Sequence, residues 1–432
     1  RPSYPARDSV TGSSSTWAQA SGREPDHFRR FVMMVAGALL VALVLLYWLV
    51  QVSMLTRCML VVPTLDIEVR PSREADELVT VIVPARDEEP ELETAIRSRL
   101  LEEDSRLRFI FVNDRSTDAT GSIMEQVASE DERAEVIHVE ELPEGWLGKV
   151  HAMQVGVEAS SSPWILLSDA DVHFMPGTVR SAVDLAEERG VDHLAMIPSI
   201  MSPSLGLRFC LVPLLRTLSF MVRLWSVHDS ASTAAMGVGA FNLVRRDTLI
   251  EAGGLESLKM EVIDDIGVGT IIKQHGGTSL VAAGRHGIRI AWYDRFEDFL
   301  QGIQRGTAHL PQGVPRVFLV LVCLFLFLLE VSPFLMLLAW PWLPALGWIG
   351  AVASTVVILL SFTLARYFGL PRMAALAVPA GVALGLYAAA RCIMKGGRDG
   401  VIYWRGTRYR VSELQAGERV RFHADRFRSD HD

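Results

Sequence analysis

The sequence is poor in cysteine and has no excess of positive charge, and both observations limit the classes of function that it can have. The four cysteines, Cys58, Cys210, Cys323 and Cys392, are far apart in the 432-residue chain and lie in apolar surroundings. That pattern excludes a CxxC metal site and argues against a disulfide framework. The formal net charge of -8 argues against nucleic acid as the main partner. Half of the residues are hydrophobic, which is compatible with a soluble domain plus membrane segments.

Apolar runs long enough to cross a bilayer lie toward both ends of the sequence. Residues 1–27 show no hydrophobic periodicity and predict a disordered tail. The run Phe31–Val50 lacks the features of a cleaved signal peptide, so it predicts a transmembrane anchor at 31–50. A mixed linker is expected at Thr56–Arg73. Further spans are predicted within residues 317–394, at Val317–Trp340, Leu346–Ala365 and Met373–Ile393, before a basic tail at 395–432.

Other apolar segments are interrupted by polar residues. Pro203–Val227 contains arginines and a proline, so it predicts an amphipathic helix on the membrane or on the domain rather than a span. Phe296–His309 predicts a second interfacial helix. Glu330 lies inside a predicted span, where it is either a functional carboxylate or the mark of a helix break near the interface. Gly381 and Gly385 form a GxxxG spacing, which allows close helix packing.

Between these apolar parts, residues 78–310 alternate short β-compatible segments with helical ones. Such alternation implies right-handed βαβ units and a parallel sheet, so the fold class is α/β. Strands are expected at Val79–Val83, Arg108–Val112, Val136–Val139 and Trp164–Ser168. Helices are expected at Glu88–Leu101, from a cap at Ser116 or Thr117 through Ala128, and at Lys149–Glu158.

The stretch around which the domain is organised is Trp164–Phe174, with the sequence WILLSDADVHF. A buried strand there delivers Asp169 and Asp171 at its carboxyl end, the edge of an open α/β sheet where ligands bind. Two carboxylates one residue apart can share Mg²⁺ or Mn²⁺, which completes its shell with substrate phosphate oxygens.

Three more features are expected at the strand ends of the same sheet. They are the turn at 84–88, the pair Asn113-Asp114 and the pair Gly148-Lys149. Asp114 suits a nucleobase or ribose, and Lys149 suits phosphate. Taken singly, Asp114 is an ordinary helix-capping residue and Lys149 an ordinary solvated charge, but their joint occurrence favours a nucleotide site.

The ordered set of motifs resembles the inverting family 2 glycosyltransferases, which have the GT-A fold. The donor half is carried by VTVIVPARDEEPELETAI, FVNDRSTDATGSI, GWLGKVHAMQVGVEAS and WILLSDADVHFMPGTV. The acceptor half is carried by MGVGAFNLVRRDTLIEAGG and VIDDIGVGTIIKQHGG. The whole layout, with its C-terminal spans and YWRGTRY at 403–409, is most similar to membrane enzymes that glycosylate hopanoids, carotenoid acids or ceramides.

The resemblance implies a GT-A, Rossmann-like catalytic domain at 78–310 and a role for each matching residue. Asp265 takes the place of the catalytic base; the ordinary alternative for Asp264 and Asp265 is charge at a helix N-terminus. Asp87 stands where the family often has Asn, and the QxxRW signature is incomplete around Arg305. The implied nucleotide-sugar contacts are Pro84, Ala85, Glu88, Asp114, Lys149, Asp169 and Ala170, with Asp171 as metal ligand, and Gly239, Asp264, Gln304 and Arg305 on the acceptor or diphosphate side.

These features predict a membrane-bound inverting glycosyltransferase that moves one sugar, glucose being expected, from a UDP-sugar to a lipid with Mg²⁺ or Mn²⁺. The acceptor is a carotenoid, hopanoid or ceramide-like lipid; a polyprenyl phosphate acceptor and an inactive membrane scaffold are the alternatives. A nucleotidyltransferase is disfavoured because its first loop, here PARDEE, would carry glycine. No nucleic-acid partner is expected.

The predicted location is the inner (cytoplasmic) membrane, with several spans and the catalytic domain in the cytoplasm. One span before that domain and three after it would place the basic tail outside, which violates the positive-inside rule. One C-terminal apolar stretch is therefore expected to be re-entrant or interfacial.

Overall fold

The computed structural model describes residues 24–69, 76–305, 314–395, 401–404, 407–418 and 420, with side chains except at 24–27, 304–305 and 402–404. The chain divides into two compact units, Arg1–Val50 and Gln51–Asp432.

The first helix, α1 (Glu24–Val61), is longer than predicted at both ends. The expected tail 1–27 overlaps it because Pro25, with acidic neighbours, suits the first turn of a helix. The expected linker Thr56–Arg73 is helical up to Val61, because Leu55 and Cys58 are buried in a core cluster of the second unit.

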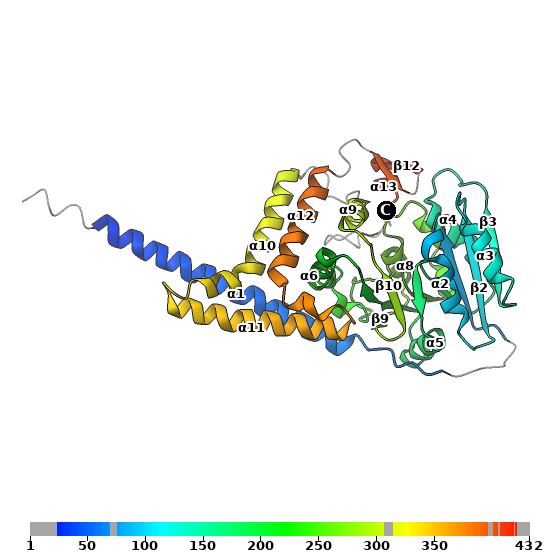
Figure 1. Cartoon of the computed structure of the whole chain (residues 1–432), viewed down its shortest axis with the longest axis horizontal. Helices are drawn as coiled ribbons and strands as arrows, with labels where there is room; N and C mark the ends of the chain where they lie inside the picture. Colours follow the sequence, from blue (N-terminus) through cyan, green and yellow to red (C-terminus); the bar gives the residue numbers. More distant parts are fainter. Residues whose placement is uncertain are drawn as a thin grey trace, which may run out of the picture. The chain divides into compact units, whose positions relative to one another are not determined.

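The α/β domain is built on a seven-stranded sheet of order β3-β2-β1-β4-β8-β6-β9 (Figure 1). Its strands are β1 (Val79–Ala85), β2 (Leu107–Asp114), β3 (Ala134–Val139), β4 (Trp164–Leu167), β6 (His193–Ile197), β8 (Asn242–Arg245) and β9 (Ser279–Ala283). The strands β1 to β4 pair in parallel, as predicted. Strand β8 runs antiparallel to both β4 and β6, so the sheet is mixed rather than purely parallel.

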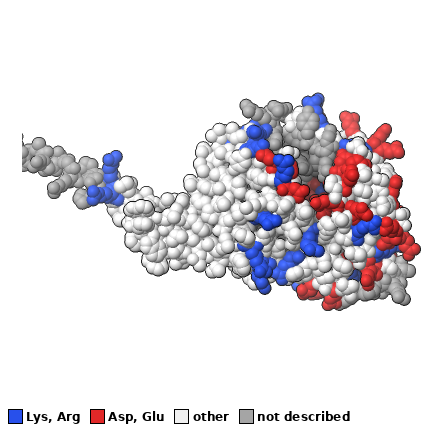
Figure 2. Space-filling model, viewed as in Figure 1, with Lys and Arg blue, Asp and Glu red and all other residues white. Residues whose placement is uncertain are grey.

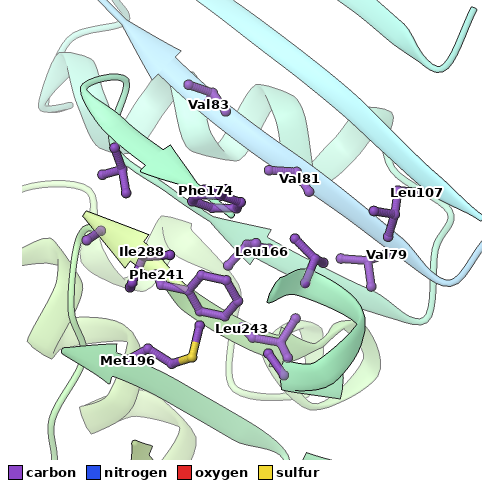
Figure 3. Close-up of a cluster of buried hydrophobic side chains, with 14 of the residues drawn as sticks. Val79, Val81, Val83, Leu107, Leu166, Phe174, Met196, Phe241, Leu243 and Ile288 are labelled. Carbon is purple, nitrogen blue, oxygen red and sulfur yellow. The ribbon is translucent and has the colours of Figure 1, made fainter. Parts of the chain in front are cut away.

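Hydrophobic side chains cover both faces of this sheet. Val81 and Val83 of β1 belong to one buried cluster, whereas Ile82, between them, belongs to another on the opposite face. The alternation follows from the two-residue repeat of a strand, and burial of both faces is typical of parallel sheets. Figure 3 shows the first cluster, in which Phe174 and Phe241 lie near Leu166 and Leu243.

Helices connect and cover the strands. They are α2 (Glu89–Leu100), α3 (Thr120–Ala128), α4 (Gly148–Ala159), α5 (Thr178–Arg189), α7 (Arg246–Glu251) and α8 (Asp264–Gln274), with short 3-10 turns η1 (Leu224–Ser226) and η2 (Leu255–Leu258). The pair Gly148-Lys149, expected at a strand end, instead forms the first turn of α4.

The predicted cap of α3 by Ser116 or Thr117 is wrong, because both side chains bond to Asp87 instead. The Ser116 hydroxyl accepts from the Asp87 N–H (3.2 Å), and the Thr117 N–H and hydroxyl donate to the Asp87 carboxylate (2.8 and 3.2 Å). These bonds join the turn after β1 to the turn after β2, and α3 begins only at Thr120.

A small second sheet lies beside the main one, in the order β5-β10-β7. Its strands are β5 (Val172–Phe174), β10 (Ile288–Ala291) and β7 (Ser199–Met201). The two predicted amphipathic helices follow two of these strands: α6 (Leu205–Met221) comes after β7, and α9 (Phe296–Arg305) comes after β10. The predicted continuation of α9 to His309 lies outside the described residues.

Three apolar helices follow, α10 (Arg316–Leu338), α11 (Pro344–Tyr367) and α12 (Val378–Lys395), with the short turn η4 (Arg372–Ala375) before α12. They and Phe28–Val61 of α1 are long and apolar enough to cross a membrane. Helix α10 is continuous through Glu330, so the alternative of a break there is wrong. A Cβ on Gly381 would lie 2.1 Å from the Phe209 carbonyl oxygen of α6, whereas Gly385 is open among the described residues, so only Gly381 packs closely.

The predicted basic tail contains regular structure. Strands β11 (Val401–Trp404) and β12 (Thr407–Arg410) pair antiparallel, and α13 (Val411–Ala416) follows.

Candidate active site

The site lies where the chain reverses direction across the sheet. From β1 the chain continues to β2 and β3 on one side, while β4 pairs with the other side of β1. Such a switch point leaves a crevice beyond the carboxyl ends of the two central strands. Pro84 and Ala85 end β1 at this crevice, and Asp169, Ala170 and Asp171 follow β4.

The crevice is an open cleft of about 830 Å³. All the predicted nucleotide-sugar contacts and the predicted metal ligand line it. Its lining consists of Pro84, Ala85, Arg86, Glu88, Asp114, Gly148, Lys149, Asp169, Ala170, Asp171 and Tyr409. Arg86, Gly148 and Tyr409 were not predicted as site residues, although each stands inside a motif that the sequence analysis singled out.

Lys149 is not a solvated surface charge. Its Nζ lies 2.8 Å from Asp169 Oδ1 and 2.8 Å from Asp264 Oδ2, and its side chain is 26% exposed. Burial opposes its charge, but the carboxylates of Asp169 and Asp264 hold the pKa of Lys149 well above its ordinary value. Lys149 therefore ties the turn after β4 to the first residue of α8.

Asp171 is a carboxylate of the cleft whose charge the nearby Arg99 offsets only in part. Burial, with the nearby charges of Asp169 and Glu88, raises the pKa of Asp171 to about 7. A cation at this point would relieve the repulsion. Among the described residues, no three His, Cys, Asp or Glu side chains form a ready metal cage. One or two carboxylates with substrate phosphates and water are what Mg²⁺ uses, so the donor set fits Mg²⁺ or Mn²⁺.

Arg99 supports this turn from beneath. Its guanidinium is fully buried and donates to the carbonyl oxygens of Asp169 and Ala170 and to the Ser168 hydroxyl. Sequence analysis missed this residue. The available signal was a charge at position 99 on the same helical face as the apolar Leu92.

Asp265 lines a smaller cavity of about 220 Å³, which shares Lys149 and Asp169 with the cleft. The Gly239 N–H donates to Asp265 Oδ2 (3.1 Å), and the Gly239 carbonyl accepts from the Asp169 N–H (2.9 Å). A Cβ on Gly239 would lie 2.5 Å from Asp169 Oδ2, so this bridge requires glycine. A single residue, Gly239, therefore connects the predicted base Asp265 to the predicted donor site at Asp169.

Burial, with the charge of Asp264, raises the pKa of Asp265 to about 7. A carboxylate with that pKa is suited to accept a proton near neutral pH. Asp264 and Asp265 also open α8, so the ordinary interpretation as helix N-terminal charge holds as well. It does not explain the pairing of Asp264 with Lys149 or of Asp265 with Gly239.

Two of the predicted acceptor-side residues, Gly239 and Asp264, are therefore in the site. The side chains of the other two, Gln304 and Arg305, lie outside the described residues. Asp87 has a φ of 52°, a left-handed conformation that Asp and Asn tolerate. Either residue can therefore occupy this position.

Comparisons with known proteins relate part of the chain to glycosyltransferases. The model of Glycosyl transferase family 2 matches residues 80–225, about a third of the chain. The chain is 31% identical over 115 residues to the uncharacterized glycosyltransferase EpsJ of Bacillus subtilis (strain 168), a match to 27% of this chain. The match spans about a third of that relative's length (32%).

Two solved structures are similar at low identity. The mannosyltransferase PcManGT from Pyrobaculum calidifontis, in complex with GDP-Man and Mn²⁺, has a TM-score of 0.46 and 19% identity, covering 84% of this chain and 97% of that chain. S. aureus TarS has a TM-score of 0.37 and 14% identity, covering 71% and 54%. Residues 80–225 are thus similar to glycosyltransferase family 2. The predicted GT-A-like α/β fold with one N-terminal and three C-terminal apolar helices is confirmed.

Proposed function

We propose that this chain is a membrane-bound inverting glycosyltransferase that moves one sugar from a UDP-sugar to a lipid. The observation that carries the proposal is the Gly239 bridge. It joins a cleft with the charges needed to bind a nucleoside diphosphate to a carboxylate, Asp265, whose pKa suits a general base.

In the donor site, Ala85, Glu88 and Asp114 contact the uridine, and Asp169 lies near the ribose and diphosphate. Asp171 would hold Mg²⁺ or Mn²⁺, which neutralises the charge that develops on the leaving diphosphate. Lys149 adds a positive charge at the inner end of the cleft. Because Lys149 pairs with both Asp169 and Asp264, it fixes the position of the donor side of the site relative to the side of the base.

On the acceptor side, Asp265 takes the proton of the attacking hydroxyl. The hydroxyl oxygen forms a bond to the anomeric carbon as the bond to the diphosphate breaks. Attack on the face opposite the diphosphate inverts the configuration, so a UDP-α-sugar gives a β-linked product. The Gly239 N–H holds Asp265 in place by a direct hydrogen bond. The ion pair between Lys149 and Asp264 fixes the residue that precedes Asp265 in the chain.

A lipid acceptor is supported by the exposed apolar surface of the helices that follow the α/β domain. Leu321 of α10 and Leu359 of α11 are 55% and 61% exposed. In the face shown in Figure 2, charged side chains gather over the α/β domain, whereas most of the surface over α10 and α11 is uncharged. Because each CH₂ costs about 0.8 kcal/mol to bring into water, a lipid is best left in the bilayer with only its polar end at the site.

The contacts of the helix ends support a specific membrane topology. At the end of α11, Arg285 donates to the Arg366 carbonyl (3.0 Å), and the Ser199 hydroxyl donates to the Gly369 carbonyl (2.8 Å). After α12, Thr407 accepts from Arg86 (3.4 Å). The chain therefore contacts the α/β domain both before and after α12.

We infer that α10 and α11 cross the membrane and return, while α12 stays on the side of the domain. Its Cys392 thiol contacts the Leu300 carbonyl of α9, and Arg391 pairs with Glu297 of α9 (2.8 Å). With α1 as a further span and the domain in the cytoplasm, the basic tail is also cytoplasmic, in agreement with the positive-inside rule.

The function is tested with the purified full chain, UDP-glucose, Mn²⁺ and a panel of carotenoid, hopanoid, sterol, ceramide and diacylglycerol acceptors. Mass spectrometry should find a lipid carrying one hexose, with a β-linkage by NMR, and EDTA should abolish its formation. A water-soluble polysaccharide as main product, or undiminished transfer after verified metal depletion, would contradict the proposal.

The topology is tested by labelling single introduced cysteines with a membrane-impermeant thiol reagent, in a background in which the four native cysteines are replaced by serine. Met373→Cys and Arg408→Cys should react from the same side, and Trp342→Cys from the opposite side. Reaction of Met373→Cys and Arg408→Cys from opposite sides would show that α12 crosses.

A further inference from the structure

One wall of the donor cleft comes from a distant part of the chain. Ten of the eleven described residues that line the cleft fall between positions 84 and 171. The eleventh, Tyr409, belongs to β12, which follows the last apolar helix. Tyr409 also lies outside the segment 80–225 that matches the family model.

The segment that carries Tyr409 is anchored on both sides of the active site. On the donor side, the Arg86 guanidinium donates to the Thr407 hydroxyl (3.4 Å). On the other side, the Val420 N–H donates to the buried carboxylate of Glu261 (2.9 Å), shortly before Asp264 in the chain. In Figure 1, β12 and α13 lie at the end of the α/β domain that carries this site.

Close packing supports the same placement. A Cβ on Gly417 would lie 2.4 Å from the Cβ of Met260, so the chain after α13 is in tight contact with the loop before α8. Tyr409 and Leu414 are 7% and 3% exposed and belong to the hydrophobic cluster that includes Leu147, at the entrance to α4. The ring is therefore held in place before any ligand arrives.

We propose that Tyr409 is a donor-binding residue, which contacts the nucleoside part of the nucleoside diphosphate and so completes the cleft. This inference rests on the proposed function. A packed aromatic ring offers an apolar face to a base at little further cost in conformational entropy. None of the other described residues that line the cleft is aromatic, so Tyr409 supplies an aromatic surface that the segment 80–225 does not place there.

The test measures UDP binding, in the presence of Mn²⁺, to the full chain in nanodiscs by calorimetry. Tyr409→Leu keeps apolar volume in the cluster but removes the aromatic face, so it should raise the Kd for UDP about tenfold, as expected for loss of base stacking. Tyr409→Phe keeps the ring and should stay within about threefold of wild type. Arg408→Ala, at an exposed position of the same strand, is the matched control and should bind like wild type.

Steady-state kinetics give a second readout. Tyr409→Leu should raise KM for UDP-glucose more than it lowers kcat, while KM for the lipid stays unchanged. Equal UDP affinity in Tyr409→Leu and Arg408→Ala, with both variants folded, would overturn the assignment of Tyr409 even if the enzyme transfers sugar. Absence of sugar transfer by wild-type protein that still binds UDP would instead overturn the proposed function.

Discussion

Among the described residues, the charges around Lys149 and the pair Arg216–Glu330 differ in balance and in access. In the active site, Lys149 lies among carboxylates that outnumber it, Asp169 and Asp264 in direct contact and Asp265 nearby. The other set joins Arg216 of α6 to Glu330 of α10, whose side chains are 3% and 10% exposed. The first set opens onto a cleft, whereas the second is closed.

The difference indicates two uses of buried charge. An excess of carboxylates beside a cleft raises their pKa values and favours binding of a cation, which is typical of functional sites. A sealed pair of one cation and one anion gains little net stability over apolar residues, but loss of either partner is costly. We therefore expect the first set to control turnover and the second to fix α6 against α10.

The largest expected effect comes from removing the proposed base. Asp265→Asn keeps the shape of the side chain but removes its basic site, so turnover should fall by roughly 10²-fold or more while UDP binding stays near normal. Because the folded state raises the pKa of Asp265 from 3.8 to about 7, the free energy of unfolding falls as pH rises between these values, and the whole cost of the buried charge is present above pH 7. The variant should therefore be at least as thermostable as wild type at pH 8. A folded variant with ordinary turnover would show that Asp265 is not the base.

Breaking the closed pair should act on stability instead. Arg216→Met leaves Glu330 buried without its arginine and should lower the free energy of unfolding by about 3 kcal/mol. Adding Glu330→Leu should restore most of that loss, since the pair is then replaced by apolar side chains. Below its melting temperature, the double variant should keep normal turnover.

The exposed pair Arg391–Glu297 provides a control for this experiment. These side chains are 30% and 56% exposed, so Glu297→Ala should cost less than about 1 kcal/mol. Thermal and denaturant unfolding of the full chains measure all three variants. A loss in Arg216→Met no larger than in Glu297→Ala would show that the buried pair does not hold the helices.

The most gradual effect is expected from pH. Asp265 must be ionised to accept a proton, and its pKa is about 7. At saturating donor and metal, kcat should be level at alkaline pH and fall about tenfold for each pH unit below 7. The residual activity of Asp265→Asn should lack this dependence. A flat wild-type profile between pH 5 and 8 would contradict the assignment.

Much of the donor half of the site was predictable because local sequence and strand topology determine it. Residues at the ends of parallel strands meet at one edge, so Pro84, Asp114 and Asp171 were expected together before any coordinates. The strand–helix alternation also predicted the α/β class, and the long apolar runs predicted the apolar helices. The capping of α3 was mispredicted because Ser116 and Thr117 bond across to Asp87, a contact that local preferences do not contain.

The sequence by itself thus determined the fold class, the apolar helices and the donor motifs, since each is a property of a short segment. Only the tertiary structure decided the rest. It placed Arg99 beneath the Asp169 turn, paired Arg216 with Glu330 and brought Tyr409 into the cleft. These contacts join residues far apart in the chain, and their partners are selected by how whole elements pack rather than by any periodicity within one segment.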